Sequence, residues 1–175
     1  RCICHIFRNQ KMIFGLFIIS ALLFADSTYS QTPSPPSQSA SAPIEAQLDK
    51  PIPDSKFTFY GASGRGACGL DVQPCSAAAS GDLFDPAGQW VPSDMEDKRY
   101  ILDDPICKGI CIKVEYQGKS AVFPVDNKCP ECKPNHVDLS TAAFLVLEPK
   151  GGVVGIAKDA TLTYLKCEGQ TISKC

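Results

Sequence analysis

Cysteines constrain this chain more than any other feature of its sequence. The 175 residues contain ten cysteines, and eight of them fall between Cys68 and Cys175. Such a density is typical of proteins from oxidising compartments, where disulfides stabilise domains that have small hydrophobic cores. An even number permits a closed set of disulfides, but many pairings are open and the sequence does not choose between them. We therefore expect one small, disulfide-stabilised domain.

The N-terminal segment indicates how the chain reaches such a compartment. A largely apolar run follows Met12 over residues 13–24, which suits a signal-peptide core and is too short for a transmembrane helix. We expect a start at Met12 and a leader over residues 1–30, whose removal also removes Cys2 and Cys4. The expected product is secreted, lies outside the cell or in the cell wall, and has no membrane association after cleavage.

The rest of the chain divides into a linker and one folded domain. Residues 31–55 are rich in Pro, Ser, Ala and Gln, and their few large apolar side chains cannot offset the entropy of ordering, so they predict a disordered linker. Residues 56–175 then form the domain.

The formal net charge is -2 and no basic run occurs, which argues against nucleic acid as a partner. We expect a monomer.

Short alternating segments predict an all-β domain. Residues 56–60 are aromatic and β-branched, and residues 110–116 alternate between apolar and polar side chains, as half-buried strands do. Residues 120–125 follow a tight turn as the hairpin partner, and residues 159–167 predict a last strand. Residues 141–147, preceded by a serine that can cap them, predict one short helix. A small closed barrel would hide the edges of these strands.

The segment Asn127–Phe144 holds the side chains most suited to chemistry. Cys129 and Cys132 have a spacing known from zinc and redox sites, but the cysteine-rich, all-β context favours a disulfide, so we expect no metal and no other cofactor. Asp138 can hydrogen-bond a sugar or donate a proton if burial raises its pKa, or it can cap the helix that follows. His136 can polarise a ligand or be a surface-loop histidine.

Trp90, the only tryptophan, lies in a turn-rich region that spans residues 70–106. An exposed aromatic side chain in such a loop can stack on a sugar ring. Burial over the small core is the favoured interpretation, because tryptophan is usually well buried.

Five motifs, in this order along the chain, resemble the expansin and barwin superfamily. They are Phe57-Thr-Phe-Tyr-Gly61, Gly66-Ala-Cys-Gly69, Cys107-Lys-Gly-Ile-Cys-Ile-Lys-Val114, Asn127-Lys-Cys-Pro130 and His136-Val-Asp138. The resemblance implies a six-stranded double-psi β-barrel with one or two short helices. Loosenins, rare lipoprotein A domains, papain inhibitors and some endoglucanases are similar in the same way, so the resemblance implies a fold that several functions share.

The resemblance also implies an open polysaccharide groove, lined by Asp138 close to Thr58 and Tyr60. The related endoglucanases carry a further aspartate in the first strand, where this chain has none, and an inverting glycosidase needs two carboxyls about 6.5–9.5 Å apart. Several relatives have an aspartate at the position of Asn127. Asp126 is offset by one residue, and strand alternation would turn it to the other face. A conventional hydrolase is therefore not expected.

These observations lead to three functional hypotheses. The first is an expansin-like protein that binds cell-wall polysaccharide, such as cellulose, chitin or a related glycan, and loosens the wall without hydrolysis. The second is a protein-binding module, either an inhibitor of a secreted papain-type protease or an effector. The third is a weak endoglucanase. Asp138 is the catalytic candidate, and the candidate substrate-binding residues are Thr58, Tyr60, Trp90, Asp126 and His136.

Overall fold

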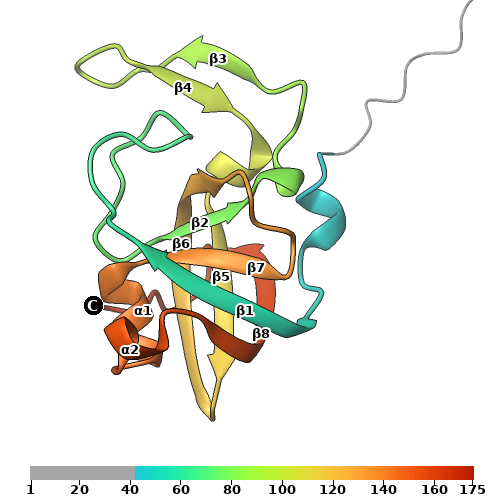
Figure 1. Ribbon diagram of the computed structural model, residues 1–175. Coiled ribbons are helices and arrows are strands. Elements are labelled where there is room, and N and C mark those ends of the chain that lie inside the picture. Colours follow the sequence, from blue (N-terminus) through green and yellow to red (C-terminus); the bar gives the residue numbers. More distant parts are fainter. Residues whose placement is uncertain (1–41) are drawn as a thin grey trace, which may run out of the picture. The chain divides into compact units, whose positions relative to one another are not determined.

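The computed structural model describes residues 42–175, so the predicted leader and the first part of the predicted linker lie outside the described residues. Six strands close into a barrel (Figure 1). In the order in which they are hydrogen-bonded around the barrel, they are β1 (Ile52–Tyr60), β7 (His136–Ser140), β2 (Ala77–Ser80), β6 (Lys119–Cys129), β5 (Ile110–Tyr116) and β8 (Ala157–Lys166). The pairs β1–β7 and β2–β6 are parallel and the other pairs are antiparallel. The predicted closed, all-β barrel is confirmed.

One hydrophobic core fills the barrel. Phe57 on β1 is fully buried, and its ring lies 5.0 Å from that of Tyr116 and 5.0 Å from that of Phe144. Phe144 belongs to α1 (Thr141–Leu147), which packs against β1, β6 and β7. Burying one such large side chain stabilises the fold by about 1.5–3 kcal/mol. The predicted helix is confirmed, and a short α2 (Gly151–Val154) follows it.

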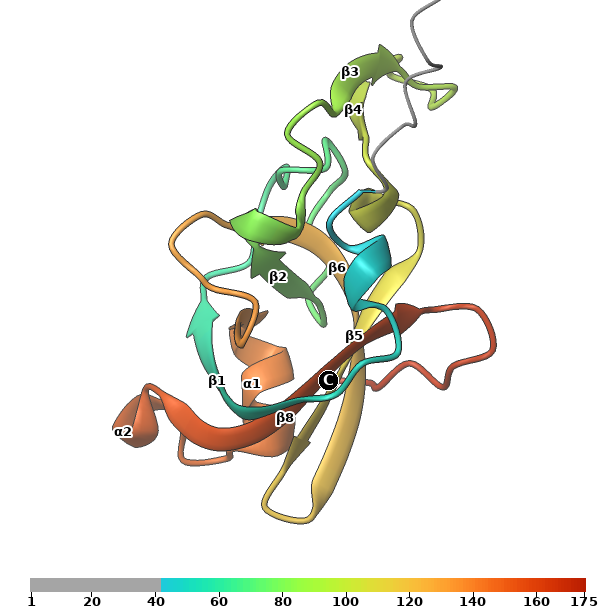
Figure 2. The same cartoon turned by 90° about the vertical axis from the view of Figure 1, so that its right-hand side faces the viewer.

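The folded part begins earlier than the sequence predicted. The predicted linker includes residues 42–55, yet β1 begins at Ile52 and a short η1 (Glu45–Gln47) precedes it. Ile44 is fully buried, and η1 lies beside the start of β5 in Figure 2. The linker prediction is therefore wrong for these residues. A few apolar side chains are enough to order the segment, because the barrel provides a surface on which they are buried.

Four disulfides complete the frame, as the even number of cysteines predicted. Three of them join segments that are 39, 100 and 56 residues apart, and the fourth closes a local turn. The pairs are Cys68–Cys107, Cys75–Cys175, Cys111–Cys167 and Cys129–Cys132. A disulfide that closes a long loop typically stabilises a domain by about 2–4 kcal/mol.

Within residues 42–175, no helix has both the length and the apolar character that a membrane span requires.

A small hairpin stands apart from the barrel. It consists of β3 (Gln89–Pro92) and β4 (Tyr100–Asp103), which pair only with each other, and Figure 1 shows it projecting beyond the barrel strands. Short helical turns flank it, namely η2 (Gly81–Leu83) and η3 (Pro105–Cys107). The turn-rich composition of this region did not reveal the hairpin, because its strands are only four residues long.

Ser140 provides a test of how the helix is attached. Its side chain donates to the backbone oxygen of Pro74 at 2.7 Å and accepts from the amides of Ala143 and Ser76, each at 3.2 Å. Ser140→Ala leaves these buried groups without partners, so we expect the free energy of unfolding in urea to fall by about 2–4 kcal/mol. The exposed Ser120→Ala on β6 is the control, with a change within about 0.5 kcal/mol. Equal effects of the two substitutions would contradict the role of Ser140.

Candidate functional site

A row of side chains crosses the outer face of the barrel. Thr58 on β1 lies opposite Asp138 on β7, which lies opposite Ala78 on β2, which in turn lies opposite Asn127 on β6. Residues at the same register on neighbouring strands share a face, and the sequence neighbours of Asp138 on β7 point into the core. The row therefore presents polar groups on both sides of the small Ala78. We call Thr58, Asp138, Ala78 and Asn127 the polar row.

A hydrogen-bond relay runs along one end of the polar row. The Thr58 hydroxyl donates to Oδ1 of Asp138 at 2.8 Å, and its oxygen lies 2.9 Å from Nε2 of His136. A threonine hydroxyl has one proton, so while Asp138 is ionised and accepts that proton, Nε2–H of His136 is the donor in the second contact. Thr58 thereby links the imidazole of His136 to the carboxylate of Asp138. His136 is the first residue of β7, so its interpretation as a surface-loop histidine is wrong.

Partial burial changes the protonation of both ionisable members of the relay. Burial raises the pKa of Asp138, the hydrogen bond from Thr58 lowers it, and the exposed Glu131 raises it again. Burial lowers the pKa of His136, and the neighbouring Lys56 lowers it further. Glu131 partly opposes the shift of His136. Both net shifts disfavour the charged forms, so the imidazole loses its proton more easily than an ordinary histidine and the carboxyl gains one more easily than an ordinary aspartate. Asp138 does not cap the helix, because the N-cap of α1 is Ser140.

Tyr60 lies beyond Thr58 on the same face of β1. Its ring packs against Ala78 and the Cys129–Cys132 disulfide, and its hydroxyl is buried without completing a hydrogen bond. Burial raises the pKa of the Tyr60 hydroxyl, the nearby Asn127 side chain lowers it, and the Asp126 and Asp138 carboxylates raise it. The Cys129–Cys132 disulfide therefore has a structural role, because it supports the Tyr60 ring beside the polar row. Among residues 42–175, no three His, Cys, Asp or Glu side chains are arranged to hold a metal ion.

Asp126 lies at an irregularity of β6, where regular strand alternation is interrupted. The register passes from Ala77 opposite Val125 to Ala78 opposite Asn127, so Asp126 is the extra residue of a β-bulge. Asp126 is 5% exposed, and its Oδ2 accepts from the amide of Gln73 at 2.7 Å. Its Oδ1 is buried without a partner, and burial raises the pKa of this carboxyl. Asp126 therefore anchors the loop after β1 from beneath and offers little surface to a ligand.

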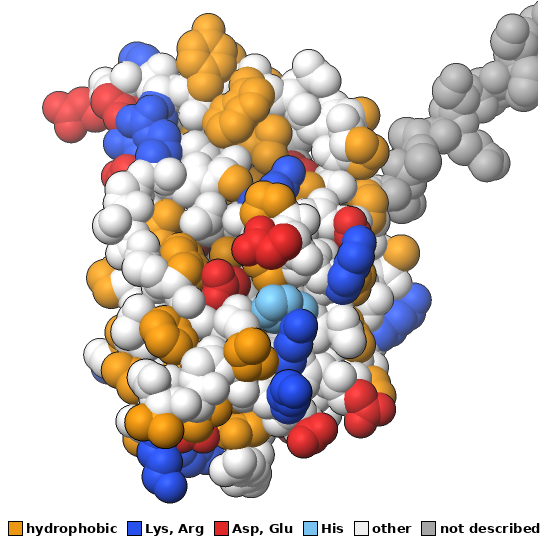
Figure 3. Space-filling model, in the orientation of Figure 1, with side chains coloured by type: hydrophobic (Ala, Val, Ile, Leu, Met, Phe, Trp, Pro, Cys, Tyr) orange, Lys and Arg blue, Asp and Glu red, His pale blue; other side chains and the backbone are white. Residues whose placement is uncertain are grey.

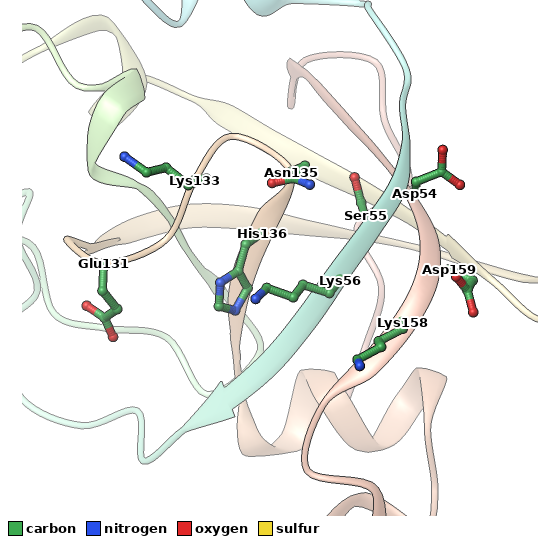
Figure 4. Close-up of a pocket in the computed structure, with 9 residues that line it drawn as sticks. All are labelled: Asp54, Ser55, Lys56, Glu131, Lys133, Asn135, His136, Lys158 and Asp159. Carbon is green, nitrogen blue, oxygen red and sulfur yellow. The ribbon is translucent and has the colours of Figure 1, made fainter.

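A cleft of about 300 Å³ opens beside the relay. Its lining combines charges of both signs with amide and hydroxyl groups, and Figure 4 shows the Lys56 side chain reaching towards the His136 ring. The lining residues are Asp54, Ser55, Lys56, Glu131, Lys133, Asn135, His136, Lys158 and Asp159. In Figure 3 the same face shows a histidine with basic and acidic side chains close around it. This surface suits a polar ligand with many hydroxyl or amide groups.

Trp90 is exposed, contrary to the favoured interpretation that it packs over the core. It lies on β3 with 52% of its surface accessible, outside both the polar row and the cleft. The strands of the hairpin pair only with each other, and the Trp90 ring lies against Gly69 of the loop after β1.

Comparison with known proteins places the chain in a family. None of the family models matches it. A papain inhibitor of Streptomyces mobaraensis is 38% identical over 117 residues, which are 63% of this chain and 75% of that protein. The chain belongs to the papain inhibitor family. The solved Streptomyces papain inhibitor shares the fold of this family member, with a TM-score of 0.53 and 28% identity over 68% of this chain and 97% of the inhibitor.

An expansin of Clavibacter michiganensis, solved as a mutant in complex with cellohexaose, is more distant. Its TM-score is 0.44 and its identity 17%, over 65% of this chain and 50% of that one. The six-stranded barrel of this papain inhibitor family member fits the double-psi β-barrel of the expansin-like superfamily, as the sequence motifs implied.

Sequence reasoning missed two side chains beside the relay. Lys56 precedes Thr58 by two residues, so strand alternation was a usable signal that both share a face. Glu131 lies in the turn between Cys129 and Cys132, and nothing in the sequence indicated that this turn approaches Asp138.

Asp138→Asn tests whether partial burial of this carboxyl opposes folding. A raised pKa means that the folded state binds the proton more tightly, so stability falls as pH rises from about 3.9, the ordinary aspartate value, through the folded pKa. The substituted asparagine would still accept from Thr58 but cannot ionise. We expect the variant to match the wild type at pH 3 and to exceed it at pH 7 by on the order of 1 kcal/mol in urea unfolding. A difference that does not change with pH would contradict this assignment.

Proposed function

We propose that the protein is a secreted inhibitor of papain-type cysteine proteases. The observation that carries the proposal is the 38% identity to a papain inhibitor over 117 residues. The similarity in fold supports it, since it extends over 97% of the solved inhibitor and therefore over nearly all of that chain.

The physical properties of the barrel support the same proposal. An inhibitor must resist the protease that it meets, and it binds tightly when its contact segments are ordered in advance. The closed barrel leaves few strand edges open, and four disulfides fasten its loops and its C-terminal segment. Disulfides persist in oxidising compartments, which agrees with secretion.

Inhibition is measured with the purified, oxidised protein. We expect it to reduce hydrolysis of a peptide substrate by papain in proportion to its concentration, with an inhibition constant of about 1 µM or below, as for a specific protein interface. The protease is activated first and separated from reductant, because thiols would open the disulfides of the inhibitor. A serine protease is the control and should be unaffected. Full papain activity at a large excess of the protein would refute the proposal.

The polar row favours a second candidate function, binding of cell-wall polysaccharide without hydrolysis. Thr58, His136 and Asp138 offer oriented donors and acceptors at a partly exposed surface, and sugar hydroxyls can use both. Glu131, whose charge raises the pKa of Asp138, is exposed on a turn, and Asp126, next to Asn127 of the polar row, is buried under a loop. This arrangement supports binding more than it supports an acid and base pair.

Sedimentation with insoluble polymers tests the second candidate. We expect cellulose or chitin to retain the protein and Thr58→Val to reduce retention several-fold, since two hydrogen bonds of the relay are lost. Thr161→Val on β8 is the matched control, as it lies away from the polar row. No retention of the wild type would refute polysaccharide binding. Release of reducing sugar that Asp138→Asn abolishes would instead support a weak endoglucanase.

A further inference from the structure

The β3–β4 hairpin carries large apolar side chains that are exposed to solvent. Trp90 is 52% exposed, Met95 38% and Tyr100 59%. In Figure 3 hydrophobic side chains gather at the top of the molecule, over the position of this hairpin in Figure 1. Exposed apolar clusters of this kind are typical of protein interaction sites.

The register of the hairpin puts its exposed aromatic side chains on one face. Trp90 pairs with Leu102, and Pro92 pairs with Tyr100. Directly opposite residues and residues two apart along a strand share a face, so all four lie on the same side of the ribbon. Leu102 at the base packs against the core, while Trp90 and Tyr100 extend the apolar face into solvent.

The base of the hairpin is fixed to the barrel. The Cys68–Cys107 disulfide joins the loop after β1 to η3, and the amide of Leu102 donates to the oxygen of Cys68 at 3.0 Å. Gly69 has a φ of +77°, and a Cβ there would come within 2.4 Å of the Tyr100 backbone oxygen. This position therefore requires glycine for both backbone angle and space.

The tip of the hairpin is held by charged side chains. Arg99 donates to Asp97 at 2.6 Å within the hairpin and to Asp71 at 2.7 Å on the loop after β1. The amide of Ser93 donates to the oxygen of Arg99 at 2.9 Å, which closes the tip. The hairpin is thus ordered before any partner binds, and this reduces the entropy lost on association.

We propose that the β3–β4 hairpin is the element that enters the active-site cleft of a papain-type protease, with Trp90 and Tyr100 as the main contacts. The inference rests on the proposed inhibitory function. A protease cleft is concave and needs a projecting partner, and the hairpin projects from the barrel, whereas the polar row lies beside a cleft of its own. Tryptophan, tyrosine, methionine and arginine are the residues most enriched at the centres of protein interfaces.

Alanine substitutions on the hairpin test the proposal in the papain assay described above. We expect Trp90→Ala and Tyr100→Ala each to raise the inhibition constant by at least about tenfold, as for central interface residues. Val153→Ala on α2 is the matched control, since Val153 is 91% exposed and apolar but lies outside the hairpin. Ser120→Ala, at an exposed position on β6 of the barrel, is a second control. Neither control should change the inhibition constant more than about twofold.

Two further measurements distinguish a lost hairpin contact from an unfolded variant and from binding elsewhere on the protease. Thermal unfolding of each variant should match the wild type, because the substituted side chains are largely exposed. Papain whose cleft is filled by a covalently attached peptide inhibitor should no longer bind the protein. Inhibition by folded hairpin variants at wild-type strength, or binding to the blocked enzyme, would overturn the hairpin proposal and leave the inhibitory function standing. A wild-type protein that does not inhibit papain at all would overturn both.

Discussion

The parallel pairing of β1 with β7 is the constraint on which the rest of this structure depends. It sets Thr58 opposite Asp138, across 80 residues of sequence, and it also closes the barrel, since β1 bonds β8 on its other edge. A slip of one residue would turn Asp138 into the core and Val137 out to solvent. Core packing therefore enforces the same register that assembles the relay of His136, Thr58 and Asp138. The packing of the barrel core is therefore sufficient to position these three side chains.

The barrel supports two surfaces of opposite character. The polar row and its neighbouring cleft are lined by groups that exchange hydrogen bonds and charge, while the β3–β4 hairpin offers a projecting apolar face. Buried polar atoms without partners, the Tyr60 hydroxyl and Oδ1 of Asp126, lie close to the polar row. Such atoms reduce stability, and natural proteins accept that reduction mainly at functional sites. The disulfides and the aromatic core offset it.

Predictions from strand alternation and helix capping were confirmed where one local physical effect determined the structure. Alternation defined the strand Ile110–Tyr116 to the residue, and a serine cap followed by an apolar run defined the helix after Ser140. The same rules failed where a distant segment intervened. The bulge at Asp126 depends on how β6 meets β2, and the order of residues 42–55 depends on a barrel surface that exists only after folding. The exposure of Trp90 likewise depends on a hairpin whose strands pair only with each other.

The sequence by itself determined the class of this protein. Its cysteine content and its short alternating segments predicted a disulfide-stabilised, all-β barrel, and its ordered motifs resembled those of the expansin and barwin superfamily, which implied the double-psi fold and a role for Asp138. Only the tertiary structure decided which cysteines pair, which side chains Thr58 joins by hydrogen bonds, and which face Trp90 and Tyr100 share. The physical reason is that periodicity and composition are properties of neighbouring residues. Register, burial and hydrogen-bond partners are set instead by segments that meet only when the chain closes on itself.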